Sequence, residues 1–469
     1  MLFFSTGQFV KPSDLPTDFF QDSLRATISD EANQCVSCGL CLPHCPTYRV
    51  TLSEADSPRG RIALISGVAS DRLPMNERFV EHMDRCLTCR ACEVACPNQV
   101  QFGQLIDEAR TMINSSPFDL GKGKTGKRKS RVRRWLEKEF LAEPLRIDAL
   151  RPFLRFYQRS GLQKWVRKSG LLGKTRLALL EAQLPLIDKP RASSMNHGSI
   201  ASWRSVYPAI GKSRGNVGLF LGCVARLADV TTINSAIFVL NRLGYTVYLP
   251  RSQTCCGALH RHSGDMRFAG QLEQQNVRAF DGLNLSAIIS TASGCGVQLA
   301  EYSFFSPSQR ARGAHQIKRG SIETPPPKPP AVMDVSAFLA TAEGWDDVQL
   351  ATFPNKILVH EPCSLRNVLR GSAHSYALLR RIPGARVASL PGNDQCCGAA
   401  GTYFIDQPEI AKALLEDKTA ALAADNARYL ATSNVGCAMY IGSGLREAGL
   451  SVEVIHPVTL IARQMGIQS

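Results

Sequence analysis

Short apolar runs alternate with longer segments of helical spacing along the C-terminal half of the chain, and the alternation occurs twice. The first set of apolar runs is 217–221, "TVYLP" and "AIISTA", and the second is 357–359, "RVASLP" and "RYLATS". A segment with helical periodicity follows the first run of each set. Strands that alternate with helices form parallel sheets with crossover helices. The pattern therefore predicts two related α/β units.

Four cysteines repeat together with these apolar runs. Each unit consists of a cysteine, 31 or 32 residues, Cys-Cys-Gly, 37 or 38 residues, and a last cysteine. The carboxyl ends of parallel strands meet at one edge of a sheet, so cysteines far apart in sequence can converge there. The candidate cluster ligands are Cys223, Cys255, Cys256 and Cys295 in the first unit, and Cys363, Cys396, Cys397 and Cys437 in the second.

The vicinal cysteines explain why each unit, here called a CysCysGly unit, has a glycine after them. One turn supplies two thiolates, and Gly257 or Gly398 lets the backbone approach an inorganic core without a clashing side chain. The alternative is that these cysteines are small buried apolar residues beside a turn. Two occurrences at matched offsets favour the ligand interpretation.

Two further cysteine runs, "CVSCGLCLPHCP" and "CLTCRACEVACP", lie near the N-terminus. Both have the CxxCxxCxxxCP spacing of iron-sulfur proteins, in which the fourth cysteine of each run ligates the other cluster. One 4Fe4S cluster is thus assigned Cys35, Cys38, Cys41 and Cys96, and the other Cys86, Cys89, Cys92 and Cys45. Zinc is the alternative, but structural zinc sites usually take two cysteine pairs separated by about a dozen residues or more.

The segment between these runs, "SPRGRIALISG", predicts a turn that leads into a helix. Arg59 and Arg61 would offer positive charge to an anionic cluster, or would simply be solvated residues at the start of the helix. The sequence does not decide between the two.

The composition is that of a globular protein with two or three domains: 469 residues, 44% hydrophobic and 20% charged. No apolar run approaches the roughly 18 residues of a membrane span. The N-terminus "MLFFSTGQFV" lacks the basic region and cleavage site of an export signal. We therefore expect a cytoplasmic protein whose sixteen cysteines stay reduced as ligands or redox groups.

The net charge of +15 is concentrated in one segment. Residues 117–189 contain nineteen Lys and Arg and seven Asp and Glu. After a basic loop, "GKGKTGKRKSRVRRW", helical spacing places Leu150, Phe153, Leu154 and Tyr157 on one face, and Leu162, Trp165 and Val166 on another.

Basic helices with interspersed aromatic residues suit an anionic membrane leaflet, and they suit equally a helical linker that docks a flavoprotein. Nucleic acid is not among the expected partners, because no nucleic-acid-binding fold accompanies the lysines. The "GKGKTG" match to a nucleotide loop is rejected, since no strand precedes it and Arg128 occupies the Ser/Thr position of a P-loop. The organic substrate is therefore expected to react in another chain.

Four other residues are weaker candidates. His260 and His262 follow the first Cys-Cys-Gly, and His360 and Glu361 precede Cys363. They are candidates for supporting hydrogen bonds or alternative ligands, and the commoner role of such a histidine is a hydrogen bond within a loop. The prolines of "TPPPKPP", 324–330, predict a stiff connector.

The cysteine pattern, with "DSPRGRIALI", "DRCLTCRACEVACP", "TASGCG" and "SNVGC", resembles the iron-sulfur subunit family of glycolate oxidase and related 2-hydroxy-acid oxidases. The resemblance implies a subunit on the cytoplasmic face that passes electrons from a partner flavoprotein, an FAD-binding oxidase subunit, to the quinone pool or another membrane acceptor. It also implies two 4Fe4S clusters, with candidate further clusters in the CysCysGly units.

The CysCysGly units also resemble those of heterodisulfide reductase and of the anaerobic glycerol-3-phosphate dehydrogenase iron-sulfur subunit. The fullest motif there ends in CxxC, whereas Ala292 and Asn434 stand three residues before the last cysteine here. Four thiolates per unit remain, which could hold a 4Fe4S cluster or stay free of metal. A disulfide-reducing catalytic subunit is the alternative function.

The expected fold class is α+β and multidomain, with a helical two-cluster ferredoxin domain and two related α/β domains with parallel sheets. The expected boundaries are 1–112 for the ferredoxin-type domain, 113–210 for a basic helical connector, 211–330 for the first CysCysGly domain and 331–469 for the second. Peripheral contact with the inner membrane face is expected through 117–189.

Overall fold

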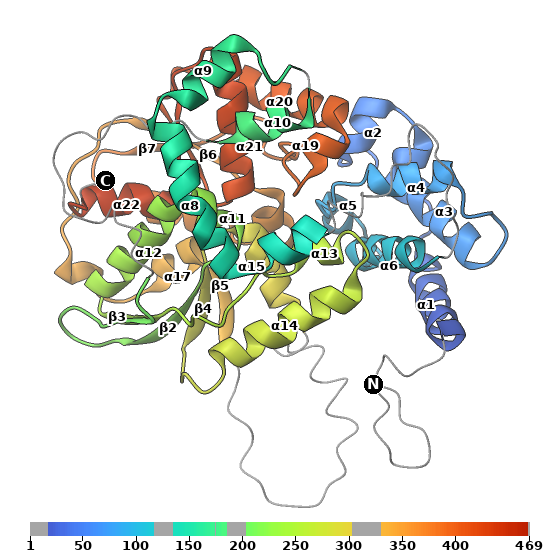
Figure 1. Ribbon diagram of the computed structural model, residues 1–469, viewed down its shortest axis with the longest axis horizontal. Helices are drawn as coiled ribbons and strands as arrows, with labels where there is room; N and C mark the ends of the chain where they lie inside the picture. Colours follow the sequence, from blue (N-terminus) through green and yellow to red (C-terminus); the bar gives the residue numbers. More distant parts are fainter. Residues whose placement is uncertain (1–16, 117–134, 174, 185–202, 303–329, 468–469) are drawn as a thin grey trace, which may run out of the picture. The chain divides into compact units, whose positions relative to one another are not determined.

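The structure is a computed structural model that describes residues 17–116, 135–173, 175–184, 203–302 and 330–467 (Figure 1). The basic loop 121–134, the N-terminal segment 1–10 and the proline connector except Pro330 lie outside the described residues. The chain forms two compact units. The ferredoxin unit comprises 1–128 and 259–266, and the α/β unit comprises 129–258 and 267–469.

The ferredoxin unit is helical throughout its described part. Its helices are α1 (Thr17–Ala32), α2 (Pro46–Thr51), α3 (Pro58–Ala69), α4 (Glu77–Asp84), α5 (Ala91–Val94) and α6 (Phe102–Ser115), with the 3-10 turn η1 (Glu54–Asp56). Ile65, Met83, Leu105 and Ile106 are fully buried between α3, α4 and α6. The predicted turn into a helix is confirmed, since Pro58 opens α3 and the Ser57 hydroxyl accepts the Gly60 amide at 3.0 Å.

A buried carboxylate joins the elements between the two cysteine runs. Asp56 is fully buried, and its oxygens lie 2.9 Å from His82 Nδ1, 2.9 Å from Arg85 Nη1 and 3.4 Å from Arg61 Nη2. The Asp56 carbonyl accepts the Thr47 hydroxyl at 2.9 Å, at the start of α2. The charge of Arg61 is therefore balanced inside the protein.

Two sheets carry the α/β unit (Figure 1). The strands are β1 (Val206–Tyr207), β2 (Gly215–Phe220), β3 (Tyr245–Tyr248), β4 (Ala287–Ser290), β5 (Ala331–Asp334), β6 (Lys356–His360), β7 (Arg386–Ser389), β8 (Tyr429–Thr432) and β9 (Glu453–Ile455). The orders are β1-β3-β2-β4-β5 and β7-β6-β8-β9. All pairs are parallel except β1 with β3. The predicted parallel sheets are thus confirmed, with one antiparallel edge strand added.

Helices connect the strands and join the two sheets into one core. They are α11 (Val224–Ala228), α12 (Val230–Arg242), α14 (Met266–Phe280), α15 (Ser293–Ala300), α17 (Val335–Thr341), α18 (Ser372–Leu379), α19 (Tyr403–Asp406), α20 (Pro408–Ala423), α21 (Val435–Glu447) and α22 (Pro457–Gln464), with the turns η3 (Trp345–Asp347) and η4 (Ser364–Leu369). Helix α13 (Ala258–Arg261) belongs, except for Ala258, to the ferredoxin unit. Helix α12 packs on α22, and Ile233, Leu240, Leu460 and Ile461 are buried in the shared core.

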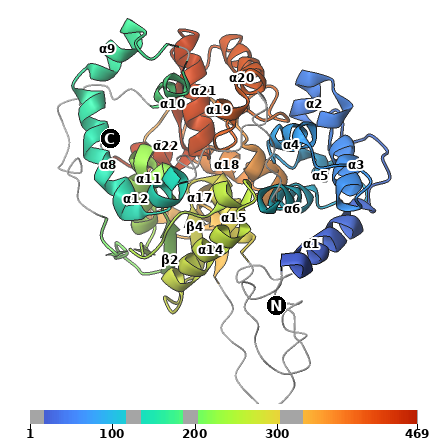
Figure 2. The same ribbon diagram turned by 45° about the vertical axis from the view of Figure 1, so that its right-hand side comes forward.

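The linker helices pack against both CysCysGly units. They are η2 (Glu137–Leu141), α8 (Pro144–Arg159), α9 (Leu162–Ser169) and α10 (Arg176–Gln183). Helix α8 contacts α11, and α10 lies beside α19 and α21 (Figure 2). The predicted helix is confirmed by α8, but its buried side chains are Ile147, Arg151 and Gln158, whereas Phe153 of the shared apolar face is 74% exposed. Within the described residues, no helix has the length and apolar content to cross a membrane.

Replacement of Asp56 tests the buried carboxylate. Asp56→Asn leaves the buried Arg61 without its counter-charge, which costs ~3 kcal/mol in unfolding free energy, whereas Arg85 keeps its ion pair with Glu81. The measurement is anaerobic urea unfolding. Asp71→Asn is the matched control, because Asp71 pairs with Arg25 at the surface and its side chain is 73% exposed, so a change well under 1 kcal/mol is expected. Equal effects would contradict the role of the Asp56 network.

Candidate metal centres

The two cysteine runs of the ferredoxin unit adopt the same backbone turns. Ser37 and Gly39 have left-handed φ values of 55° and 83°, and Thr88 and Arg90, at the same places in the second run, have 51° and 58°. Left-handed residues bend a short loop back on itself, so that neighbouring side chains point to one centre. The two runs, which have the same cysteine spacing, therefore also have the same left-handed backbone positions.

The thiols of these runs influence one another within each expected ligand set. Burial raises the pKa of Cys92 well above its ordinary value, and the thiols of Cys89, Cys86 and Cys45 add to the increase. Cys45 belongs to the other run, so the fourth ligand expected by crossed ligation lies in this group. Burial likewise raises the pKa of Cys41 to about 11, with a contribution from Cys35 and Cys38.

Arginines hold both loops through backbone oxygens. Arg110 Nη2 donates to Met83 O at 2.9 Å and to Cys86 O at 2.6 Å, and its Nη1 donates to Thr88 Oγ1 at 2.9 Å. Arg59 Nη1 donates to Ser37 O at 3.1 Å while its Nε pairs with Glu54 at 2.6 Å. Four thiols in each loop, held on left-handed turns by the buried Arg110 and the partly exposed Arg59, fit an anionic iron-sulfur cluster.

The first CysCysGly unit brings its cysteines together at the ends of its strands. Cys223 follows β2, and its Sγ lies 3.5 Å from Cys255 Sγ. The Gly257 amide donates to Cys255 Sγ at 3.5 Å. A Cβ at Gly222 would stand 3.3 Å from Cys295 Sγ, so the last cysteine also reaches this place. A shared hydrogen bond with Cys255, together with burial, raises the pKa of Cys223 well above its ordinary value.

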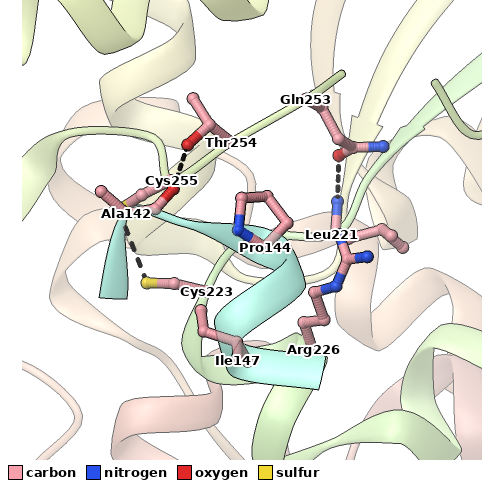
Figure 3. Close-up of a pocket in the computed structure, with 10 residues that line it drawn as sticks. Ala142, Pro144, Ile147, Leu221, Cys223, Arg226, Gln253, Thr254 and Cys255 are labelled. Carbon is pink, nitrogen blue, oxygen red and sulfur yellow. Dashed lines mark hydrogen bonds between the residues drawn. The ribbon is translucent and has the colours of Figure 1, made fainter. Parts of the chain in front are cut away.

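The linker forms one wall of this site (Figure 3). Ala142, Pro144 and Ile147 line a pocket together with Cys223 and Cys255. The Thr254 hydroxyl, next to the vicinal pair, donates to Ala142 O. The linker segment thus fixes the turn that carries two of the thiols.

The second CysCysGly unit has the same thiol arrangement in different surroundings. Cys363 Sγ lies 3.9 Å from Cys396 Sγ, and the Gly398 amide donates to Cys396 Sγ at 3.4 Å. Hydrogen bonds from Cys363 and Cys397 lower the pKa of Cys396 well below its ordinary value, and the charge of Lys418 lowers it further. The thiolate form of Cys396 is therefore favoured, whereas hydrogen bonds with Cys396 and Cys437, together with burial, raise the pKa of Cys397 well above its ordinary value.

A histidine joins the second site. One ring nitrogen of His360 and the sulfurs of Cys397 and Cys437 all lie within 4.8 Å of one another, and all three residues are buried. His360 Nδ1 is 2.9 Å from Thr432 Oγ1. Burial lowers the pKa of His360 to about 3, so the imidazole is neutral and available as a ligand.

Family comparisons agree with this geometry. Residues 31–100 match the model of a 4Fe-4S dicluster domain, 217–300 and 357–442 each match a cysteine-rich domain, and 128–184 match the linker region of the glycolate oxidase iron-sulfur subunit. The chain is 34% identical to the probable glycolate oxidase iron-sulfur subunit of Bacillus subtilis, over 93% of this chain and 94% of that one. The chain belongs to the glycolate oxidase iron-sulfur subunit family.

Other members and relatives are more distant. The glycolate oxidase iron-sulfur subunit of Escherichia coli is 27% identical over 92% of this chain and 95% of its own length. Lactate utilization protein A of Oceanobacillus iheyensis is 28% identical over 51% of this chain and 93% of its own length. Membership in this family confirms the expectation of an oxidoreductase subunit with 4Fe-4S clusters.

The remaining candidates from the sequence have other roles. His262 Nδ1 lies 2.9 Å from Asp107 Oδ1, inside the ferredoxin unit. Glu361 accepts the Tyr376 hydroxyl at 2.7 Å. Asn434, at the position of the missing cysteine, caps α21 by accepting the Gly436 amide at 3.1 Å. Sequence reasoning missed Lys418, although a comparison of the two repeats would have revealed a lysine in place of an asparagine.

The two motif glycines provide a matched pair for mutation. Both have left-handed φ values, 85° at Gly257 and 88° at Gly398, so alanine costs about 1–2 kcal/mol at either. A Cβ on Gly398 would also lie 2.7 Å from the Ala411 carbonyl oxygen, whereas the nearest atoms to a Cβ on Gly257 are 3.5 Å away. We expect Gly398→Ala to lower the thermal unfolding midpoint more than Gly257→Ala. The reverse order would contradict this packing.

Proposed function

We propose that this protein is the electron-transfer subunit of a 2-hydroxy-acid oxidase and passes electrons from an FAD-binding oxidase subunit toward quinone. The observation that carries the proposal is the dicluster domain at one end of a chain that matches glycolate oxidase iron-sulfur subunits over nearly its whole length. Glycolate or lactate is the substrate class suggested by the names of the relatives. The substrate itself is oxidised in the partner.

The eight N-terminal cysteines are the proposed ligands of two 4Fe4S clusters, with Cys45 and Cys96 exchanged between the runs. Iron-sulfur clusters transfer single electrons, which links a two-electron flavin to a stepwise acceptor. Cys38 is exposed, whereas Cys92 is buried. The exposed thiol supports an entry or exit point for electrons at the cluster that Cys38 ligates.

The CysCysGly cysteines are the proposed ligands of further iron-sulfur centres. The Sγ separations of 3.5 and 3.9 Å exceed a disulfide bond length of about 2 Å, and four thiols meet in each unit. Gly257 and Gly398 would contribute through the left-handed turn of their backbone, because a Cβ at either position would meet α14 or α20 rather than a thiol. Ala292 and Asn434 replace the fifth cysteine of the disulfide-reducing relatives, so no feature of the described residues favours that alternative function.

Replacement of one cluster ligand tests the electron path. Cys38→Ser is expected to remove one cubane, which lowers the iron content by roughly four atoms per chain, and to abolish electron transfer from the hydroxy acid to a quinone analogue. Oxidation of the hydroxy acid by the flavoprotein with an artificial dye should be unchanged. If the flavoprotein purified without this chain cannot reduce the dye, the proposal that it oxidises the hydroxy acid by itself would be contradicted.

We further propose that the linker helices place the protein on an anionic membrane surface. Exposed fractions are 80% for Leu145, 74% for Phe153, 70% for Phe156, 57% for Trp165 and 64% for Leu177. Exposed Arg146, Lys164 and Lys168 lie on the same helices. Apolar side chains with basic neighbours match the interface of an anionic leaflet, where quinone is available. The buried side chains of the linker helices pack against the CysCysGly units, whereas the exposed side chains can contact a membrane.

Vesicle binding tests the membrane contact. The double variant Phe153→Ser/Phe156→Ser is expected to reduce co-sedimentation with phosphatidylglycerol vesicles at least tenfold, because each buried phenylalanine contributes about 1.5–3 kcal/mol. Leu52→Ser in the ferredoxin unit is the control, since Leu52 is 77% exposed and lies outside the linker. Equal binding by the unaltered chain, the double variant and Leu52→Ser would exclude the linker as the contact. If the unaltered chain binds phosphatidylcholine vesicles as well as phosphatidylglycerol vesicles, the charge contribution would be excluded.

A further inference from the structure

The two CysCysGly units place different residues at one equivalent strand position. In the first sheet, Phe220 of β2 pairs with Ser290 of β4. In the second sheet, His360 of β6 pairs with Thr432 of β8. Phe220 and His360 therefore occupy the same register, three residues before the first cysteine of each unit. One unit has a hydrocarbon ring at this position, and the other has an imidazole.

The imidazole is arranged as a metal ligand. Its Nδ1 is 2.9 Å from the Thr432 hydroxyl, and a ring nitrogen lies within 4.8 Å of the Cys397 and Cys437 sulfurs. Metal-binding histidines usually donate one ring N–H to a neighbouring acceptor, which fixes the tautomer and leaves the other nitrogen for the metal. The side chain is buried, with a residue exposure of 2%, so bulk water does not compete for the ring nitrogens.

A second difference lies on the helix behind each vicinal turn. The motif glycines face Ala269 on α14 and Ala411 on α20, so these alanines are equivalent. Seven residues further along, α14 has Asn276 and α20 has Lys418. Asn276 Nδ2 donates to Cys255 O at 2.9 Å, and its Oδ1 accepts the Thr254 amide at 2.8 Å. A neutral amide therefore supports the first turn.

Lys418 supports the second turn with a positive charge. The residue is 1% exposed, and its Nζ donates to Gly392 O. Its electrostatic neighbours include the thiols of Cys396 and Cys397 and the carboxylate of Asp394. A buried ammonium is costly unless anionic groups surround it. Thiolates that hold a metal centre would supply that negative charge together with the Asp394 carboxylate.

The arginine after the first cysteine adds a third difference. Arg226 makes a two-point ion pair with Asp148 of the linker, at 2.9 and 2.6 Å. Arg366, at the same offset in the second unit, donates to the backbone oxygens of Asn393 and Asp394. The linker carboxylate thus neutralises the cation of the first site only.

We propose that His360 is a metal-ligating residue of the second CysCysGly unit, which gives this unit an iron-sulfur centre with both thiolate and imidazole ligands. The first unit has thiolate ligands only. The inference rests on the proposed presence of iron-sulfur centres in these units. An imidazole that takes the place of one of the four thiolates on the iron, with Lys418 close by, makes the centre less negative and raises its reduction potential. The second unit is then the more readily reduced of the two.

The decisive measurement is pulsed EPR on the reduced full-length protein, purified without air after labelling with ¹⁵N-histidine. A histidine nitrogen coupled to a paramagnetic iron centre is expected in the unaltered chain. The coupling should disappear in His360→Phe, which installs the residue of the first unit, and the midpoint potential of the remaining centre should shift downward. His456→Gln is the matched control, since His456 is buried in the same repeat and caps α22 by accepting the Val458 amide.

The outcomes separate this inference from the proposed function. If the unaltered chain shows no histidine coupling, but the Cys397→Ser variant contains less iron than the unaltered chain, then His360 is not a ligand. The proposed iron-sulfur centre in the second CysCysGly unit would still be supported. If Cys397→Ser leaves the iron and labile sulfide unchanged and no coupling is seen, the second-unit centre and the inference both fail. Coupling that persists in His360→Phe would assign it to another histidine and overturn the inference.

Discussion

Mutual proximity of buried thiols is the constraint on which this protein is built. Thiolates repel one another, and burial makes the charged form costlier still, as the raised pKa values of Cys92 and Cys223 show. Such groups stay together when the backbone leaves them no alternative and a cation or a metal centre supplies compensating charge. The ferredoxin unit meets the constraint with left-handed turns, and the CysCysGly units meet it with parallel strands that end at one edge.

The same constraint explains the roles of the charged residues around the thiols. Arg110 binds the carbonyl of Cys86, Lys418 lies behind the second vicinal turn, and Arg226 is held by Asp148. The fold of the backbone fixes the position of each of these cations. The linker takes part in this arrangement, because it supplies Asp148 and the carbonyl that receives Thr254.

Sequence reasoning succeeded where a local pattern determines structure. Apolar runs predicted β2 and β6, and the identical cysteine spacing predicted two equal loops. It failed where contacts join distant segments. Strand β5 completes the first sheet although nothing in its four residues distinguishes it, and the packing of Ile147 depends on a partner surface that periodicity alone does not reveal. The roles of His360 and Asp56 likewise depend on neighbours across the fold.

The second stretch of the ferredoxin unit, 259–266, begins two residues after Gly257 and has consequences for the modularity of the chain. Burial alone would raise the pKa of Asp107, but His262 and Arg261 of this stretch, together with Arg110, lower it below its ordinary value. A fragment cut at residue 128 would lose His262 and Arg261. The ferredoxin unit is therefore not separable at residue 128: during synthesis it is completed only after the ribosome has made residue 266, which is more than half of the 469 residues.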